Sequence, residues 1–255
     1  MRVVKIGGRA QADARLTAQL ADCWNAMPGE ICLVHGGGDE VSAMQRALGR
    51  EAAFVGGRRV TSQGDLELLR MVLSGVVNKR LVNSFVAAGL PAVGLSGEDA
   101  ALIRAELIDA ASLGFAGKPI SVNEAVLRAL MKAGYLPVIS PVGYNAASSK
   151  GGALNVNGDD AAAAIAAALG AEELLFIVDV EGVRDGYGEL VPNLSIETAR
   201  ELIANGVASN GMAAKLESAE TALVSGVSRV RVCGLAGLND EDRGTFITQS
   251  QSVAL

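Results

Sequence analysis

The chain has 255 residues, of which 50% are hydrophobic and 20% charged, and its 22 basic and 28 acidic side chains give a formal net charge of −6. This much apolar material can bury a full core, as one large α/β domain or two modest lobes, and it excludes a disordered chain or a miniprotein. The acidic balance, without a basic block or an aromatic-rich strand, argues against nucleic-acid binding.

The apolar stretches are too short to cross a membrane. The longest uncharged one near a helix, residues 161–171, falls well short of the roughly 20 residues that a span requires. The first residues already have a strand pattern, which leaves no room for a secretory leader, so we expect a cytoplasmic protein without membrane contact. Cys23, Cys32 and Cys233 are odd in number and lack metal-site spacing, which predicts buried thiols.

The first fifty residues alternate strand and helix patterns. The predicted elements are a strand at 2–6, a helix whose face carries Leu16, Leu20 and Trp24, a strand at 31–35 and a helix from about 39 to 48. Gly7-Gly8 closes the first strand, and Gly36-Gly37-Gly38 closes the second. This alternation predicts a mainly parallel sheet with helices on both faces.

A long apolar-periodic segment at 65–88 predicts a helix, with Ser62 and Asp65 as its capping pair and Gly75 as the point where it can kink. Further strands are predicted at 91–95, 136–142, 174–178 and 229–233, and further helices at 123–133, 159–169, 196–204 and 212–225. Between 102 and 122 we expect a β-hairpin or an edge excursion. The polar stretch 144–152 is where we expect one domain to divide into two lobes, residues 1–152 and 153–255.

The two glycine clusters favour anion binding. Each follows a strand and precedes a helix, where glycine lets backbone N–H groups turn toward an anion at the positive helix end. Neither cluster is a Walker A loop or a dinucleotide fingerprint, and each alone is equally typical of a tight turn with nothing bound. Lys5 ends the first strand, so its ammonium lies at the sheet edge where α/β proteins bind ligands, unless it is an ordinary surface lysine.

Three further places in the chain carry polar or charged side chains whose roles the local sequence does not decide. Asp159 or Asp160 caps a helix, or else Asn155 contacts a substrate while Asp159 holds cationic side chains or a metal-bearing phosphate. Lys215 lies near the start of another helix, whose dipole favours anions. His35 is the only histidine, and without a nucleophile elbow we interpret it as a structural residue at a strand end.

Taken in chain order, these motifs resemble the amino acid kinase family. The motifs that carry the resemblance are Lys5-Ile6-Gly7-Gly8, Val34-His35-Gly36-Gly37-Gly38, Gly57-Arg58-Arg59-Val60-Thr61, Asn155-Val156-Asn157-Gly158-Asp159 and Gly211-Met212-Ala213-Ala214-Lys215. Residues 71–79, residues 92–97 and Gly244-Thr245 extend it over essentially the whole chain. Within the family, the chain is most similar to the members that phosphorylate the γ-carboxylate of N-acetyl-L-glutamate in arginine biosynthesis.

The resemblance implies an open αβα sandwich, with N-acetyl-L-glutamate in the amino-terminal lobe and ATP, carrying Mg²⁺, in the carboxyl-terminal lobe. It implies that Lys5 and Lys215 stabilise the transferring phosphoryl group and that Asp159 holds both lysines. The implied substrate-binding residues are Gly37, Gly38, Arg59 and Asn155. The implied nucleotide-binding residues are Gly7, Gly8, Asp179, Val180, Glu181, Gly182, Val183, Arg184, Val207, Ala208, Ser209 and Met212.

Three residues depart from the family's pattern, namely Arg9, Asp39 and Ala214. An acidic Asp39 near a carboxylate pocket disfavours an anionic substrate unless its side chain points away. Arg58, beside Arg59, compensates for Asp39 or recognises a larger acidic substrate.

Two classes of alternative function stay open. The first is a kinase of the same family whose aminoadipate or glutamate substrate is attached to a carrier protein, which needs a wide, basic mouth. A kinase for isopentenyl phosphate fits less well, because it needs His35 beside the acceptor phosphate. The second is a nucleotide-binding storage or regulatory protein without turnover, against which the joint presence of Lys5, Asp159 and Lys215 argues.

The long segment at 65–88 also bears on assembly. Arginine-inhibited members of the family carry an additional amino-terminal helix that interlaces dimers into a hexamer, whereas four residues precede Lys5 here. We therefore expect a homodimer joined through residues 65–88, whose apolar periodicity exceeds one packed face, and an activity that does not respond to arginine.

Overall fold

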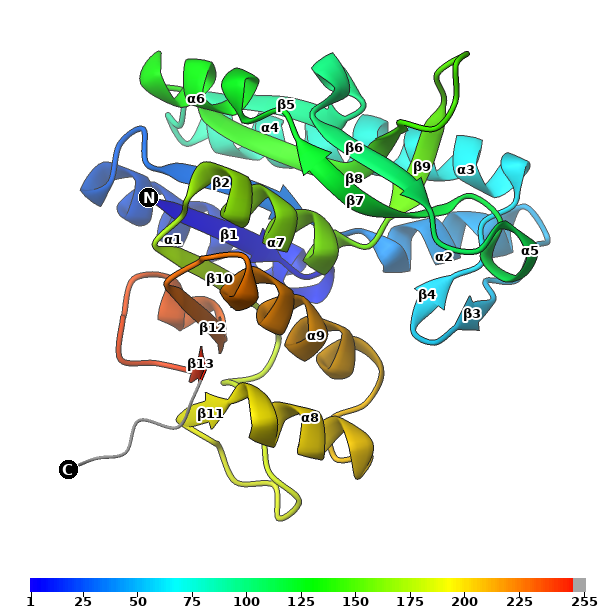
Figure 1. The fold of residues 1–255 in the computed structure, drawn as a ribbon. Coiled ribbons are helices and arrows are strands. Elements are labelled where there is room, and N and C mark those ends of the chain that lie inside the picture. Colours follow the sequence, from blue (N-terminus) through cyan, green and yellow to red (C-terminus); the bar gives the residue numbers. More distant parts are fainter. Residues whose placement is uncertain (250–255) are drawn as a thin grey trace.

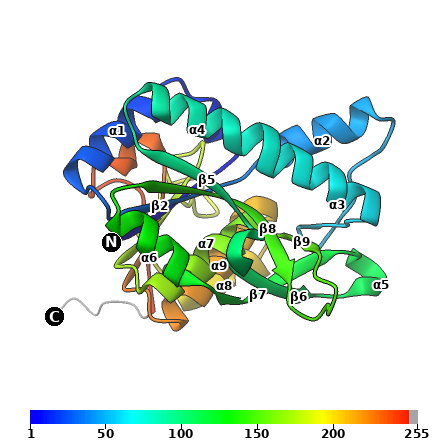
Figure 2. The same cartoon turned by 90° about the horizontal axis from the view of Figure 1, so that it is seen from above.

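A computed structural model describes residues 1–249 of the chain. In this part of the chain, one sheet of 11 strands lies between two layers of helices (Figure 1). Seen from above, α1, α3 and α4 lie on one side of the sheet and α6, α7 and α9 on the other (Figure 2). The expected αβα sandwich is thereby confirmed. None of the helices within residues 1–249 has the length and apolarity needed to cross a membrane.

The central strands of the sheet are parallel. The strand order is β11-β13-β12-β10-β1-β2-β8-β6-β7-β9, and β5 also pairs with β8. The strands of this sheet are β1 Arg2–Ile6, β2 Ile31–His35, β5 Ala92–Gly97, β6 Ile103–Leu107, β7 Ala116–Val122, β8 Leu136–Asn145, β9 Ala153–Val156, β10 Glu173–Ile177, β11 Asn193–Ser195, β12 Arg229–Cys233 and β13 Thr245–Thr248. The β6–β7, β8–β9 and β12–β13 pairs are antiparallel. A separate two-stranded hairpin consists of β3 Phe54–Val55 and β4 Arg58–Arg59.

Helices bury both faces of the sheet. One layer consists of α1 Leu16–Ala26, α2 Gly38–Ala47, α3 Gln63–Arg70, the π-helix η2 Met71–Val77, α4 Asn78–Ala87 and the short η4 Leu235–Leu238. The other consists of α6 Glu124–Lys132, α7 Gly158–Leu169, α8 Ile196–Ala204 and α9 Asn210–Val224. The remaining short helices are η1 Arg9–Ala12, η3 Asp99–Ala101 and α5 Ala110–Leu113. Because helices cover both faces, a central strand such as β2 is buried at every residue.

Most predicted elements are confirmed within a few residues. The hairpin expected between 102 and 122 is β6 and β7, with α5 between them. Ser62 and Asp65 form a reciprocal capping box at the start of α3. The helix expected at 65–88 continues through η2, where Gly75 lies in the π-helical segment. The sequence analysis missed the short strands β3, β4, β9, β11 and β13, and the expected buried, unpaired thiols are confirmed.

The stretch 144–152, where we expected the chain to divide, connects two strands of one sheet. β8 ends at Asn145, and the chain returns as β9, antiparallel to β8. The sheet itself is continuous from β9 to β11. The assignment of residues 1–152 and 153–255 to two lobes therefore stays a prediction.

Candidate functional site

Loops from three neighbouring strands meet at the carboxyl edge of the sheet. In the register of β1 with its two parallel neighbours, Ile6 lies beside both His35 and Ile177. The backbone N–H of Gly7 donates to the carbonyl of Ile177 at 3.0 Å, and that of Gly36 donates to the carbonyl of Ile6 at 3.0 Å. Both glycine clusters and the loop after β10 therefore lie side by side, at the edge where α/β proteins bind ligands.

Three charged side chains from distant parts of the chain contact one another at this edge. Lys5 Nζ lies 2.7 Å from Asp159 Oδ1, and Lys215 Nζ lies 3.4 Å from Asp159 Oδ2. Lys215 Nζ also donates to the carbonyl of Gly211 at 3.2 Å. Lys5 is the penultimate residue of β1, Asp159 is in the first turn of α7 and Lys215 is in α9, so strand and helix packing brings them together. We call Lys5, Asp159 and Lys215 the lysine cluster.

Burial and charge act in opposite directions on this cluster. Burial by itself raises the pKa of Asp159, but the charges of Lys5 and Lys215 outweigh it and hold the pKa below its usual range. Burial, with the nearby charge of Lys5, lowers the pKa of Lys215. Asp159 is therefore a charged anchor for two ammonium groups, and it is unsuited to act as a proton acceptor.

The amide of Asn157 caps α7 and so fixes the start of the helix that carries Asp159. Its Oδ1 accepts from the backbone N–H of Asp159 at 2.7 Å. Of the two alternatives left open for these carboxylates, capping by Asp159 or Asp160 is therefore excluded, because Asn157 is the cap and both carboxylates are engaged with basic or hydroxyl groups. Gly158 leaves room for Lys5, since a Cβ there would lie 3.3 Å from Lys5 Cε.

The four residues predicted to bind the acidic substrate line one cavity. Gly37, Gly38, Arg59 and Asn155 all contribute to its wall, together with Gly158 at the start of α7. Gly37 has a φ of 150°, and a Cβ there would lie 2.5 Å from Leu73 Cδ2. A side chain at this position would have to adopt this unfavourable φ and displace the side chain of Leu73, so the position favours glycine. We call this space the acid cavity.

Arg59 is held rigidly in the acid cavity. Its Nη1 donates to Gln45 Oε1 at 2.6 Å, and its Nη2 donates to the carbonyl of Gly38 at 2.9 Å and to Ser42 Oγ at 2.8 Å. The guanidinium carbon lies 4.8 Å from the centre of the Phe54 ring. Three of its five N–H donors are used in these bonds, so the fork retains donors for a ligand.

Asn155, another residue of the cavity wall, is fixed by a residue that the sequence analysis did not single out. Its Nδ2 donates to Thr61 Oγ1 at 2.9 Å. Thr61 Oγ1 in turn donates to the carbonyl of Arg59 at 2.9 Å. Thr61 lies two residues after Arg59, inside one of the motifs that resemble the family. Its place in that motif was the only indication in the sequence that it belongs to the site.

A second cavity lies beside the acid cavity, and Gly38 lines both. Its wall includes Gly7, Gly8, Asp179 and Lys215. We call it the glycine-loop cavity. Because the lysine cluster contributes Lys215 here and touches Gly158 of the acid cavity, the cluster lies between the two spaces.

The unusual residues Arg9 and Asp39 also line the glycine-loop cavity. Arg9 Nη1 lies 2.8 Å from Asp179 Oδ2. A Cβ on Gly8 would lie 3.6 Å from Asp39 Oδ2, so the carboxylate of Asp39 points toward the glycine loop. It is directed away from the acid cavity, which removes the objection to an anionic substrate there.

The structure places the other residues implied for the nucleotide in two separate loops. One loop, with Val180, Glu181, Gly182, Val183 and Arg184, follows β10, and the other, with Val207, Ala208 and Ser209, precedes Met212 in α9. Val183 and Ala208 have buried side chains, so they offer a ligand only their backbone. Their roles stay predictions.

His35 is a structural residue, as expected. It is fully buried, and its Nδ1 lies 2.7 Å from the carbonyl of Gly36, which assigns the proton to Nδ1. Its Nε2 then accepts from Asn78 Nδ2 at 3.1 Å. Burial lowers the pKa of His35 to about 4, so the ring is neutral at physiological pH. Asn78, which the sequence analysis missed, thereby joins α4 to the end of β2.

The fold and this site together define a class of protein. A mainly parallel sheet between helices carries two ammonium groups around a buried carboxylate, with glycine loops at the same edge. Such an arrangement offers preorganised positive charge and N–H dipoles to a phosphoryl group in transfer. It is the site of a phosphotransferase.

Comparisons with known proteins agree with this class. Residues 1–234 match the amino acid kinase family. An acetylglutamate kinase from Cereibacter sphaeroides is 40% identical over 260 residues, which cover 98% of this chain and 88% of that protein. One from Chloroflexus aurantiacus is 41% identical over 251 residues, which cover 98% and 97%. The solved structure of smu.665 from Streptococcus mutans UA159 has a TM-score of 0.88 at 28% identity and covers 98% of both chains. The chain belongs to the amino acid kinase family.

Proposed function

We propose that this chain is an acetylglutamate kinase, which transfers the γ-phosphoryl group of ATP to the γ-carboxylate of N-acetyl-L-glutamate in arginine biosynthesis. The observation that carries the proposal is the lysine cluster, which lies between the acid cavity and the glycine-loop cavity. The names of relatives about 40% identical over nearly the whole chain support the choice of substrate.

The acceptor is held in the acid cavity. Arg59 and Asn155 bind the polar groups of N-acetyl-L-glutamate, and the backbones of Gly37 and Gly38 approach it closely because no side chain intervenes. A guanidinium fork suits a carboxylate, since it forms two parallel hydrogen bonds in a fixed plane. The substrate's remaining carboxylate is then directed toward the lysine cluster.

The chemistry needs no general base. A free carboxyl group has a pKa of about 4, so the acceptor is already ionised at neutral pH. One carboxylate oxygen forms a bond to the γ-phosphorus while the bond from that phosphorus to the β–γ bridging oxygen breaks, and ADP leaves. Lys5 and Lys215 offset the charge that spreads over the phosphoryl oxygens, and Asp159 keeps both ammonium groups in place.

The nucleotide lies with its phosphates in the glycine-loop cavity, near the backbone N–H group of Gly8 and the start of α9, whereas the N–H group of Gly7 is used within the sheet edge. Within residues 1–249 there is no group of three or more His, Cys, Asp or Glu side chains that could hold a metal ion. In the proposed reaction Mg²⁺ is carried by the phosphates of the nucleotide, as this ion commonly is, and there it neutralises charge during transfer. Asp179 to Arg184, Val207 to Ser209 and Met212 surround the rest of the nucleotide.

The product of this reaction is an acyl phosphate, which hydrolyses readily. We assign residues 1–152 to the acid-binding lobe and residues 153–255 to the nucleotide-binding lobe, and closure of the two lobes excludes water from the reacting groups. The substrates are metabolites of the cytoplasm, where we place the enzyme.

A homodimer through the long helix is part of the proposal. Met71, Val76 and Val86 project from η2 and α4 with exposed fractions of 62%, 54% and 53%. Apolar side chains this exposed along one helical segment suit a self-complementary contact with a second copy of the chain.

The carrier-linked alternative is less well supported by the surface near the acid cavity. Arg58 Nη1 lies 2.5 Å from Asp160 Oδ2, and Lys118 Nζ lies 3.2 Å from Glu106 Oε1. Both cations are therefore already paired with carboxylates, and the rim offers little unpaired positive charge to an acidic carrier.

A substrate panel tests the proposed function. The enzyme is incubated with MgATP and, separately, N-acetyl-L-glutamate, L-glutamate, L-aspartate or isopentenyl phosphate. Hydroxylamine traps any acyl phosphate as a hydroxamate, and release of ADP reports phosphorylation of isopentenyl phosphate, whose product is a diphosphate. We expect hydroxamate only with N-acetyl-L-glutamate. Turnover confined to another acceptor, or nucleotide binding without turnover of any of them, would refute the assignment.

A further inference from the structure

Two adjacent carboxylates in the first turn of α7 connect to different parts of the molecule. Asp159 holds the lysine cluster, whereas Asp160 connects the β3–β4 hairpin to α9. Arg58 Nη1, in β4, lies 2.5 Å from Asp160 Oδ2, although the two residues are 102 positions apart. Ser218 Oγ, in α9, lies 2.8 Å from Asp160 Oδ1 and shares its single proton with the carbonyl of Ala214 at 2.9 Å.

The hairpin is a wall of the acid cavity. Phe54, Gly57, Arg58 and Arg59 all line that cavity, while β3 and β4 pair only with each other among the described strands. Figure 1 shows the hairpin apart from the main sheet, near α2 and α5. Arg59 connects the hairpin to α2, as described above, so the adjacent arginines hold it from two directions.

The other end of the connection lies on the helix that carries a catalytic lysine. Ser218 follows Lys215 by three residues, which places both on one face of α9. Ser218 is almost fully buried, and α7 packs directly against α9. A shift of the hairpin that moved Asp160 would therefore be transmitted to the turn of α9 that contains Lys215.

We infer that the Arg58–Asp160 ion pair couples the acid cavity to Lys215, so that Arg58 and Asp160 are positioning residues that make the binding of acceptor and nucleotide cooperative. An acceptor that fixes the hairpin through Arg59 also fixes α9, and the nucleotide then binds to a helix that is already in place. This inference rests on the proposed function. By linkage, the nucleotide must favour acceptor binding by the same factor.

Calorimetric titration measures this coupling directly. The dissociation constant of the Mg²⁺ complex of AMP-PNP is determined with and without saturating N-acetyl-L-glutamate, and the ratio of the two values is the coupling factor. We expect a ratio above 5 for the unaltered protein, within the usual range for coupled sites. Arg58→Gln and Asp160→Asn should each reduce it at least threefold and lower kcat, whereas Arg58→Lys, which keeps the charge, should restore part of it.

Arg200→Gln is the matched control. Arg200, in α8, forms an ion pair with Glu220, in α9, but has no contact with the hairpin among the described contacts. It should leave the coupling factor unchanged. The double variant Arg58→Gln/Asp160→Asn should lose no more than either single variant, because one interaction is removed in all three.

Three results would overturn the inference. The first is a coupling factor near 1 in the unaltered protein, and the second is an unchanged factor in folded Arg58→Gln and Asp160→Asn. The third is a defect in Arg58→Gln that Asp160→Asn does not share, which would mean that Arg58 contacts the substrate. Each is distinguishable from failure of the proposed function, in which the unaltered enzyme forms no hydroxamate with N-acetyl-L-glutamate.

Discussion

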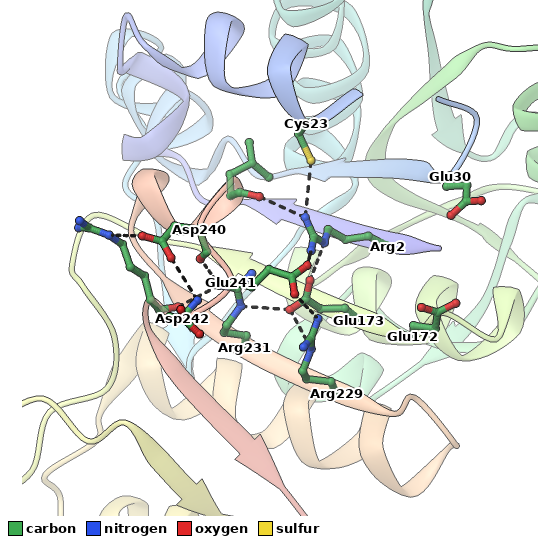
Figure 3. A network of polar contacts seen from close by, with 12 residues as sticks. Arg2, Cys23, Glu30, Glu172, Glu173, Arg229, Arg231, Asp240, Glu241 and Asp242 are labelled. Atoms are coloured by element: carbon green, nitrogen blue, oxygen red, sulfur yellow. Dashed lines mark hydrogen bonds and ion pairs between the residues drawn. The ribbon is translucent and has the colours of Figure 1, made fainter. Parts of the chain in front are cut away.

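Strand β1 carries a buried cation at each end, and the two belong to clusters with different construction. Lys5, near the carboxyl end, is part of the lysine cluster. Arg2, at the amino end, lies 2.5 Å from Glu173 Oε2, and Arg229 and Arg231 lie 3.2 and 3.0 Å from Glu173 Oε1. Figure 3 shows this second group, Arg2, Glu173, Arg229 and Arg231, which we call the arginine cluster.

The arginine cluster donates hydrogen bonds to a loop of the protein itself. Arg2 Nη1 donates to the carbonyl of Leu238 at 3.1 Å, and Arg231 Nη1 donates to those of Asp240 and Arg243 at 2.7 and 3.0 Å. These bonds hold the loop that leads into β13, whose Thr245 accepts from the backbone N–H of Val183 at 2.8 Å. The cluster thus stabilises the fold beneath the loop after β10.

The lysine cluster, in contrast, adjoins two cavities. Its contacts with Asp159 and the carbonyl of Gly211 account for three of the six N–H donors of the two ammonium groups. Buried charge alone therefore does not identify a functional site. The distinguishing feature is the adjoining space, because the arginine cluster also has an unused donor in the buried Nη2 of Arg231.

The largest expected effect concerns stability and the arginine cluster. Glu173→Gln removes the carboxylate that neutralises three arginines, and we expect a loss of about 3–5 kcal/mol in the free energy of unfolding. The folded enzyme should keep a nearly normal kcat, because the cluster lies at the opposite edge of the sheet. Urea denaturation followed by circular dichroism measures the loss, with the exposed Glu241→Gln as a control that should cost about 1 kcal/mol or less. A stable variant with a greatly reduced kcat would reverse the roles assigned to the two clusters.

Changes in the lysine cluster should have the opposite signature. Lys5→Ala and Lys215→Ala should each lower kcat by on the order of 10² or more, with a smaller effect on binding, because each removes a positioned charge from the transfer site. Steady-state assays with MgATP and N-acetyl-L-glutamate check this, with Lys118→Ala at an exposed ion pair as the control. Near-normal kcat in either variant would show that its lysine has no part in the transfer.

A smaller and more selective effect is expected at Arg59. Arg59→Lys replaces a planar fork, which binds Gln45 and the carbonyl of Gly38 while facing the acid cavity, by a single point charge. KM for N-acetyl-L-glutamate should rise about tenfold, and KM for ATP should change little. An equal rise in both constants would indicate that Arg59 supports the fold or the nucleotide.

An effect that depends on pH is expected at His35, which lies at the same edge as the lysine cluster but carries no charge at neutral pH. In the unfolded chain its pKa is about 6.5, whereas in the folded protein burial lowers its pKa to about 4. At pH values between these two, the unfolded chain binds one proton more than the folded protein. The free energy of unfolding is therefore highest above pH 6.5 and falls by up to about 3 kcal/mol as the pH falls toward 4. Denaturation at pH 7 and pH 5 should show this loss, and His35→Gln should show less of it. The same loss in both proteins would place the titration elsewhere.

Local patterns predicted much of the fold and of the lysine cluster. Strand β2 matches its predicted range because it is an almost continuous apolar run, and strand β12 matches because valine alternates with arginine along it. The capping box of Ser62 and Asp65 depends on residues three apart, so it too is visible in the sequence. The motifs around Lys5, Asp159 and Lys215 were recognisable in the same way.

Features that depend on distant residues could not be predicted. Strand β9 has four residues, and its pairing with β7 and β8 is set by tertiary structure. The π-helical stretch η2 has the same apolar periodicity as an ordinary helix. Arg58 and Asp160 are far apart in the sequence, and no local motif indicates that they form a pair. The partner of Arg58 could be assigned only once the hairpin and α7 were placed in space.

The most direct test of the central claim is the rate of the chemical step, because steady-state rates also include product release. Lys215→Met keeps the apolar stem of the side chain and removes only its charge from the lysine cluster. In a single turnover, with enzyme in excess over ATP and saturating N-acetyl-L-glutamate, acyl phosphate trapped by hydroxylamine should form on the order of 10² more slowly than in the unaltered enzyme. Formation at the unaltered rate by a folded, saturated variant would contradict the account.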